Sequence, residues 1–330
     1  MILVTGGAGF IGSNLVQALS ARGEEVVVLD RLGEGEKWRN LEGCVLAGLL
    51  PPEALEAALA MAPRAVVHLG AISATTATDG DAVAADNLML SLRLWEWCAA
   101  HRVPFLYASS AATYGDGAEG FEDVQDAASL ARFRPLNLYG WSKHAFDRRV
   151  AQMLALGRPA PPQWVGLKFF NVYGPREAHK GRMASVVLHK WREVMAGGPA
   201  RLFASDRPGI PDGGQMRDFV WVGDAVAAML WLLENPRVCG LFNLGSGRAR
   251  SFADLAGAMF AALGRAPDIE YVPMPADLAG KYQYFTEAPM ARLRQAGFAA
   301  PATPLEQGVA AYVAWLGENP WNLGGGASAP

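Results

Sequence analysis

Hydrophobic positions in the first half of the chain fall into short continuous runs, separated by stretches with helical spacing. The runs that predict buried strands are Ile2–Thr5, Glu25–Leu29, Ala65–Leu69 and Phe105–Ala108. The helices predicted between them are Ile11–Ala21, Pro52–Met61 and Asp86–His101. Strands that are apolar on both faces and alternate with helices are typical of a parallel sheet covered on both sides. The pattern therefore predicts an α/β protein with a Rossmann-type, doubly wound parallel sheet.

The pattern loosens after residue 170, where Gly, Pro and short mixed elements dominate. Further helices are predicted at Met183–Met195, Asp224–Glu234, Phe252–Leu263 and Leu305–Leu316, and a further strand at Leu241–Leu244. We predict an NAD(P)-binding Rossmann domain over residues 1–170 and a smaller, mainly substrate-binding lobe over 171–323. Segments around 217–245 are expected to return to the Rossmann domain. Residues 324–330, rich in Gly, Ala, Ser and Pro, are expected to form a flexible tail.

Composition narrows the classes of partner. The 330 residues are 51% hydrophobic and 18% charged, as in a folded globular protein. The net charge of -3 lacks the basic excess that nucleic acid requires, so we expect no nucleic-acid partner. No apolar run reaches about 18 residues, so we expect no membrane span. Cys44, Cys98 and Cys239 lack metal-type spacing, which predicts reduced thiols, no metal site and a cytoplasmic location.

A glycine-rich loop joins the first predicted strand to the first helix. Gly6, Gly9 and Gly12 permit a tight turn and let the backbone approach a pyrophosphate, which the helix N-terminus also attracts. Asp30 ends the second strand, where an acidic side chain can hydrogen-bond the adenosine ribose. The combination predicts a dinucleotide site rather than an ordinary glycine-rich turn.

Two cations follow Asp30 and bear on the choice of dinucleotide. Arg31 and Lys37 could bind a 2′-phosphate, which would favour NADP over NAD. The alternative is that both are solvated surface side chains, because exposed Arg and Lys are common.

A second motif supplies candidate catalytic groups. Tyr139 and Lys143 are four residues apart at the start of a helical run, so they share one helix face. We expect the Lys143 ammonium to lower the phenol pKa of Tyr139, so that the phenolate takes a hydroxyl proton as hydride leaves. Ser110 follows the strand Phe105–Ala108, at the sheet edge where ligands bind, and could hold the substrate oxygen. The alternative is an amphipathic helix with a solvated lysine, which the glycine loop and the Ser110 segment argue against.

With these motifs the chain resembles the extended short-chain dehydrogenases and, more closely, the ADP-L-glycero-D-manno-heptose 6-epimerases. The resemblance runs from Met1 to about Leu316 and is carried by Thr5–Asn14, Pro104–Gly115, Pro135–Gly140, Phe169–Glu177, His179–Gly181 and Met183–Val186. The stretch Glu177–Gly181 is the most particular to the heptose epimerases. The resemblance implies inversion of an ADP-heptose at C6 by a tightly bound, recycled NADP or NAD, for lipopolysaccharide inner-core precursor synthesis. It also implies a homo-oligomer, typically a pentamer.

The resemblance also implies roles for individual residues. Lys180 would be a second acid/base group on the face opposite Tyr139, and Lys143 would contact the nicotinamide ribose. The implied cofactor contacts are Gly6, Gly9, Phe10, Ile11, Gly12, Asp30, Arg31, Lys37, Leu69, Gly70, Ala71, Ile72, Ser73, Asn87, Lys143, Val172 and Lys180. The implied substrate contacts are Ser110, Asn171, Arg182, His189, Phe203, Ala204, Ser205, Asp206, Arg217 and Tyr282. Arg217 suits a diphosphate because a guanidinium binds phosphate oxygens bidentately.

Several of these roles have plainer alternatives. Lys180 could be a phosphate-binding or surface lysine, Arg217 could pair with Asp218, and His189 could be packed or solvated. Another nucleotide-sugar enzyme, such as a UDP-hexose 4-epimerase, is the main alternative function. A non-catalytic dinucleotide sensor is disfavoured because both members of the Tyr–Lys motif are present.

The chain departs from the family pattern near the cofactor and near the sugar. The segment after Asn40 is shorter, and a lysine expected near the 2′-phosphate is missing around Pro52, which leaves NADP and NAD open. Arg182 stands where a small serine is expected beside the sugar, and an extra loop over 207–215 precedes Arg217. The exact sugar therefore stays open at this stage.

Overall fold

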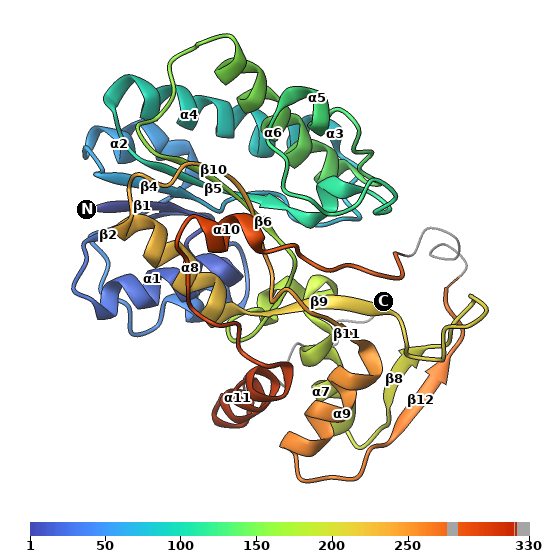
Figure 1. Cartoon of the computed structure of the whole chain (residues 1–330). Coiled ribbons are helices and arrows are strands. Elements are labelled where there is room, and N and C mark those ends of the chain that lie inside the picture. The colour runs from blue at the N-terminus through green and yellow to red at the C-terminus, as the bar shows by residue number, and fades with distance from the viewer. Residues whose placement is uncertain (276–282, 320, 322–330) are drawn as a thin grey trace.

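The computed structural model of the chain describes residues 1–275, 283–319 and 321 (Figure 1). The predicted tail at 324–330 lies outside these residues. A seven-stranded sheet forms the centre of the larger part, in the order β10-β6-β5-β4-β1-β2-β3. Its strands are β1 (Ile2–Thr5), β2 (Val26–Leu29), β3 (Gly48–Leu50), β4 (Ala65–His68), β5 (Phe105–Ser110), β6 (Trp164–Phe169) and β10 (Gly240–Leu244). All their pairings are parallel, which confirms the predicted Rossmann-type fold.

Helices cover both faces of this sheet (Figure 1). One face packs against α2 (Leu55–Ala60), α4 (Leu90–His101), α5 (Ala127–Leu130) and α6 (Leu138–Ala155). The other packs against α1 (Phe10–Ala21), α8 (Val222–Glu234) and α10 (Ala291–Gln295). The alternation is visible in β1, where Ile2 and Val4 join one core and Leu3 joins the other. Burial on both faces explains the continuous apolar runs of the sequence.

The smaller lobe has its own core. It contains a three-stranded sheet of β7 (Asn171–Tyr173), β9 (Met216–Trp221) and β11 (Ala249–Ser251), and a parallel pair of β8 (Ala200–Phe203) and β12 (Ile269–Val272). The helices α7 (Val186–Met195), α9 (Phe252–Ala262) and α11 (Leu305–Glu318) supply most of its buried side chains. The chain passes between the two parts more than once, because α8, β10 and α10 pack with the large sheet.

Short helical segments complete the described structure. They are η1 (Glu36–Leu41), η2 (Pro52–Ala54), α3 (Gly80–Val83), η3 (Ala84–Met89), η4 (Ala111–Tyr114) and η5 (Ala178–Met183). Across the described ranges, no helix is both long enough and apolar enough to cross a membrane.

The pattern of hydrophobic residues missed β6, which runs through the middle of the sheet. Its sequence contains Gly166, whose missing side chain makes room for Tyr107 and Leu241, and the charged Lys168. Lys168 is completely buried, against the usual exposure of lysine. Tertiary contacts, rather than local pattern, therefore determine this strand.

Candidate active site

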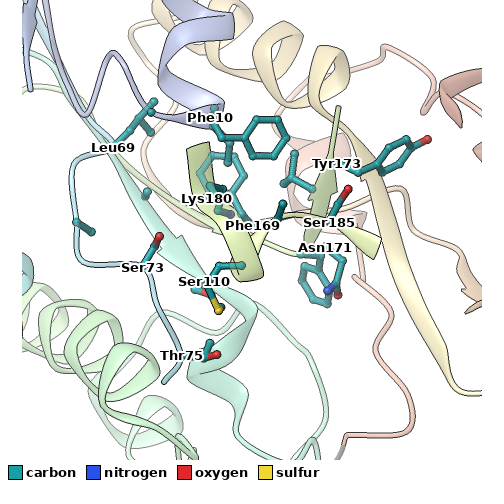
Figure 2. Close-up of a pocket in the computed structure, with 18 of the residues that line it drawn as sticks. Phe10, Leu69, Ser73, Thr75, Ser110, Phe169, Asn171, Tyr173, Lys180 and Ser185 are labelled. Atoms are coloured by element: carbon teal, nitrogen blue, oxygen red, sulfur yellow. The ribbon is translucent and has the colours of Figure 1, made fainter. Parts of the chain in front are cut away.

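A cavity of about 590 Å³ opens at the carboxyl edge of the large sheet, next to the smaller lobe. The glycine loop after β1, the end of β5, and the first turns of α6 line it from the large part. Residues of β7, η5, α7, β9 and α9 line it from the lobe. Figure 2 shows side chains from these segments, among them Ser110, Asn171 and Lys180, around one space. The carboxyl edge of a parallel sheet, where strand order reverses, is the usual ligand site in this fold.

The glycine loop is shaped by close backbone contacts. Gly6 has φ +67°, and a Cβ at this position would lie 2.5 Å from the backbone nitrogen of Gly70. A Cβ on Gly12 would lie 2.1 Å from the carbonyl oxygen of Gly6. The hydroxyl of Thr5 accepts a hydrogen bond from the Gly70 N–H at 3.1 Å and contacts His68 Nδ1 at 2.6 Å. The loops after β1 and β4 are thus fastened together beside the cavity, which leaves a backbone cradle that fits a pyrophosphate.

Asp30 and its neighbouring cations lie at the far side of this loop. The Asp30 carboxylate accepts hydrogen bonds from the Ala8 N–H at 2.8 Å and from Lys37 Nζ at 2.7 Å. Asp30 and Lys37 both line the cavity. Arg31 is not among the lining residues; its guanidinium pairs with Glu53 and lies 3.7 Å from Asp86. Both predicted cations are therefore already paired with carboxylates of the chain.

The predicted Tyr–Lys motif lies in the first turns of α6. The side chain of Asn137 caps this helix by accepting a hydrogen bond from the Gly140 N–H at 2.8 Å. Tyr139 and Lys143 then line the cavity together with Ser110 from the end of β5. Ser110 hydrogen-bonds Tyr139, and its Oγ accepts a bond from the Ala112 N–H at 3.1 Å. The structure thus brings the predicted hydroxyl, phenol and ammonium into one cavity.

The predicted effect of Lys143 on Tyr139 is wrong for this site. Burial raises the pKa of the Tyr139 phenol, and the hydrogen bond from Ser110 opposes that rise. Burial also lowers the pKa of Lys143 to about 8, against an opposing effect of Asp147. Desolvation disfavours the charged form of each group. The spacing of two residues along a helix does not reveal how deeply their side chains are buried.

Lys180 lines the same cavity from η5. Its Nζ lies 5.5 Å from the centre of the Phe10 ring, and Figure 2 shows the two side chains close together. Burial lowers the pKa of Lys180, and Glu177 opposes the shift. The buried Glu177 carboxylate accepts hydrogen bonds from the N–H and hydroxyl of Ser185, which fixes both ends of the segment that carries Lys180.

Asn87 and Ile72 were expected to contact the cofactor, but they are not among the lining residues. The buried amide of Asn87 binds both backbone groups of Ile72, at 2.8 and 3.0 Å, and the hydroxyl of Ser142 at 2.9 Å. It thereby ties the loop after β4 to α6. The lining residues of that loop include Leu69, Gly70, Ala71 and Ser73.

The predicted substrate residues divide into two groups. Asn171 and Arg217 line the cavity, as does Val172, which was predicted for the cofactor. The residues that do not line it are Arg182, His189, Phe203, Ala204, Ser205 and Asp206. Tyr282 lies outside the described residues.

Four residues of the second group, Phe203, Ala204, Ser205 and Asp206, directly precede the extra loop predicted at 207–215. The Ser205 N–H donates to Asp212 at 2.8 Å, and the Asp206 N–H donates to the hydroxyl of Tyr284 at 3.0 Å. The Arg207 guanidinium stacks 4.2 Å from the centre of the Tyr284 ring. His189 is on α7, and burial lowers its pKa.

Sequence reasoning missed most of the apolar and small residues of the cavity wall. They are Thr75, Ala108, Ser109, Phe169, Phe170, Tyr173, His179, Met183, Ala184, Ser185, Val186, Val187, Phe219, Phe252 and Leu255. The apolar residues in this group have the same sequence signature as core residues. His179 adjoins Lys180, which was a usable signal; its Nδ1 contacts Asn40 at 3.0 Å, and burial lowers its pKa to about 4.

Comparison with known proteins agrees with this geometry. Residues 2–245 match the NAD dependent epimerase/dehydratase family, and the chain belongs to this family. It is 48% identical to a Nitratidesulfovibrio vulgaris (strain DP4) protein named ADP-L-glycero-D-manno-heptose-6-epimerase, over 95% of this chain and 97% of the relative. A Fusobacterium nucleatum protein of the same name is 42% identical, with 95% and 97% covered. The resemblance predicted from the motifs is thereby confirmed.

Solved structures show the same relationship. The Helicobacter pylori ADP-L-glycero-D-manno-heptose-6-epimerase superposes with a TM-score of 0.79 at 28% identity, over 96% of each chain. The Thermus thermophilus UDP-glucose 4-epimerase in complex with NAD has a TM-score of 0.75 at 31% identity, over 95% of this chain and 97% of that one.

The contact between Gly6 and Gly70 generates a first prediction. Gly6→Ala places a methyl group against the Gly70 backbone, whereas Gly23→Ala, at a similar φ of +73°, meets nothing within 4 Å. Both variants carry the strain of a left-handed backbone. Only Gly6→Ala must also displace the loop after β4, at a further cost of roughly 1–3 kcal/mol for an overpacked site. We expect the dissociation constants of NADP and NAD, measured by calorimetry, to rise about tenfold or more for Gly6→Ala relative to Gly23→Ala. Equal constants for the two variants would contradict the proposed pyrophosphate site.

Proposed function

We propose that this chain is an ADP-L-glycero-D-manno-heptose 6-epimerase, which inverts C6 of ADP-D-glycero-D-manno-heptose. The observation that carries the proposal is that one cavity is lined by Tyr139, by Lys180 and by a glycine loop shaped for a dinucleotide. The names and the 42–48% identity of the relatives support the same reaction.

The chemistry of the substrate explains why such a site needs a redox cofactor. The hydrogen on C6 is not adjacent to a carbonyl, so its removal as a proton is not feasible at neutral pH. A nicotinamide dinucleotide, when bound, supplies a reversible hydride acceptor for this carbon. Gly6 and Gly12, where a Cβ would collide with backbone, and Asp30 at the end of β2 are the residues that would hold it.

Two side chains, Tyr139 and Lys180, then carry out the proton transfers. Ser110 holds the substrate oxygen, and Tyr139 exchanges the hydroxyl proton with it. Burial raises the pKa of Tyr139, so the phenol keeps its proton at neutral pH and can donate it. Burial lowers the pKa of Lys180, which shifts its side chain toward the neutral amine, the form that can accept a proton. At one pH, therefore, one group can donate while the other accepts, which is what inversion through two faces requires.

Substrate turnover is the direct test. We expect the purified protein to interconvert the two C6 epimers of ADP-glycero-D-manno-heptose, followed by proton NMR. In D2O the product should keep the original hydrogen at C6, because the hydride is returned and not exchanged with solvent. UDP-galactose is the comparison substrate for a 4-epimerase. Turnover of UDP-galactose without turnover of the heptose would overturn the proposal.

The two proposed acid/base groups can be tested separately. Tyr139→Phe and Lys180→Met should each lower kcat by about 10²–10⁴-fold, because each removes a proton-transfer group. Lys190→Met is the matched control, since Lys190 lies on α7 and pairs with Glu193 at 2.8 Å. Steady-state kinetics and the amount of dinucleotide retained by each variant are the measurements. Full kcat in either active-site variant would remove that residue from the mechanism.

For the cofactor itself we propose NADP, with NAD as the alternative. The Arg31 and Glu53 side chains are 58% and 62% exposed, so their ion pair stabilises the protein little. A 2′-phosphate can replace Glu53, because phosphate binds a guanidinium bidentately. Lys37 would lie next to the same phosphate, although Asp30 holds it at 2.7 Å.

This competition predicts a change in cofactor preference. Glu53→Gln removes the nearer carboxylate partner of Arg31, leaving Asp86 at 3.7 Å. It should raise the affinity for NADP relative to NAD by roughly two- to fivefold, the range expected for an exposed ion pair. Glu56→Gln is the matched control, because Glu56 pairs with Arg93 instead. Calorimetric titration of both variants with both dinucleotides gives the ratio. An unchanged ratio in Glu53→Gln would exclude Arg31 from 2′-phosphate binding.

A further inference from the structure

A fully buried ion pair lies directly behind the proposed catalytic groups. Lys168 Nζ, from β6, is 3.0 Å from Asp147 Oδ2, from α6, and both side chains are 0% exposed. Burying two charges is costly, and an apolar pair of similar size would fill the same space. The hydrogen bonds of Lys168 and Asp147 to neighbouring segments indicate a role for the pair beyond filling the core.

Both partners hold the segment that carries Ser110. Asp147 Oδ2 accepts a hydrogen bond from the Ser109 hydroxyl at 2.6 Å. Lys168 Nζ donates to the Thr113 hydroxyl at 2.6 Å, and that hydroxyl donates to the Ser110 carbonyl oxygen at 2.8 Å. The pair therefore grips this segment on both sides of Ser110.

Asp147 also belongs to the same helix face as the other two groups. It lies one turn after Lys143 and two turns after Tyr139 on α6, so the three side chains form one stripe. Its charge opposes the burial that lowers the pKa of Lys143 to about 8. Asp147 is thus placed to act on both sides of the site.

We propose that Asp147, held by Lys168, is a positioning residue that keeps Ser110 in line with Tyr139 and keeps Lys143 charged. The inference rests on the proposed function, because Ser110, Tyr139 and Lys143 are the groups that it serves.

Asp147 is the carboxylate whose charge acts on the pKa of Lys143. Asp147, Lys168 or Lys143 acts on five other titratable groups: His68 on β4, Tyr107 on β5, Tyr114 on η4, and Tyr139 and His144 on α6. Asp123, before α5, acts on Lys168, while Arg134 and Arg148 act on His144. Burial lowers the pKa of His68 to about 3 and that of His144 to about 4, so both are neutral near pH 7. Burial raises the pKa of Tyr107, whose hydroxyl donates a hydrogen bond to Asp147 Oδ1 at 3.2 Å.

The decisive measurement is the titration of Lys143 in the purified protein with its bound dinucleotide. The chain has six lysines, so side-chain NMR of carbon-13-labelled lysine can follow Lys143, with Lys143→Arg as the assignment variant. Asp147→Asn keeps the shape of the side chain and removes its charge. We expect the Lys143 midpoint to fall by roughly one pH unit, and the alkaline limb of kcat to move the same way.

Two further variants separate positioning from stability. Lys168→Met leaves Asp147 with Lys143 as its cation, so the protein should melt earlier while the Lys143 midpoint does not fall. Asp147→Asn combined with Lys168→Met has no unpaired buried charge, so its melting temperature should recover relative to Lys168→Met. Its Lys143 midpoint should stay low and its kcat reduced. A double variant with the wild-type midpoint and kcat would show that the pair is merely structural.

The outcomes also distinguish this inference from the proposed function. A wild-type protein that fails to epimerise ADP-heptose overturns the function, while the Lys143 titration still reports on Asp147. An active wild-type protein whose Lys143 midpoint is unchanged by Asp147→Asn overturns the inference alone.

Discussion

The contact between the backbones at Gly6 and Gly70 is the constraint on which the site depends. Side chains at either position would push apart the loops after β1 and β4, the two strands at which the order of the sheet reverses. Because these loops touch, the carboxyl edge of the sheet presents backbone rather than side chains to a ligand. The hydrogen bond from the Gly70 N–H to Thr5 completes this edge, and the catalytic helix α6 is then fastened to the loop after β4 through Asn87.

Burial is the second constraint, and it acts on every proposed acid/base group. The same desolvation raises the pKa of Tyr139 and lowers those of Lys143 and Lys180. Each group moves toward its neutral form, which leaves a phenol that can donate and an amine that can accept. A site of this kind does not need a Lys143 that ionises Tyr139 in advance. In our proposal Asp147 is the carboxylate that keeps Lys143 charged despite its burial.

The parts of this protein that sequence could predict are those with a local physical cause. Continuous apolar runs reveal strands buried on both faces, and the loop from Gly6 to Gly12 has a conformation that other residues cannot adopt without strain. The strand β6 was missed because its Lys168 finds a partner, Asp147, on a distant helix. Asn87 was expected to contact the cofactor, but its amide binds the backbone of Ile72 instead. The sequence pattern does not show that these two residues lie side by side.

Two ion pairs in the same domain show why location decides what a charge can do. The pair of Arg31 and Glu53 is exposed, so water and salt screen it and a competing phosphate can replace the carboxylate. The pair of Lys168 and Asp147 is dry, so neither charge can be left alone without a large cost. Exchange at the first pair is our proposed source of selectivity between NADP and NAD. The second pair stays intact and so fixes the geometry of the segment that carries Ser110. Hydride transfer requires such fixed geometry of the groups around it.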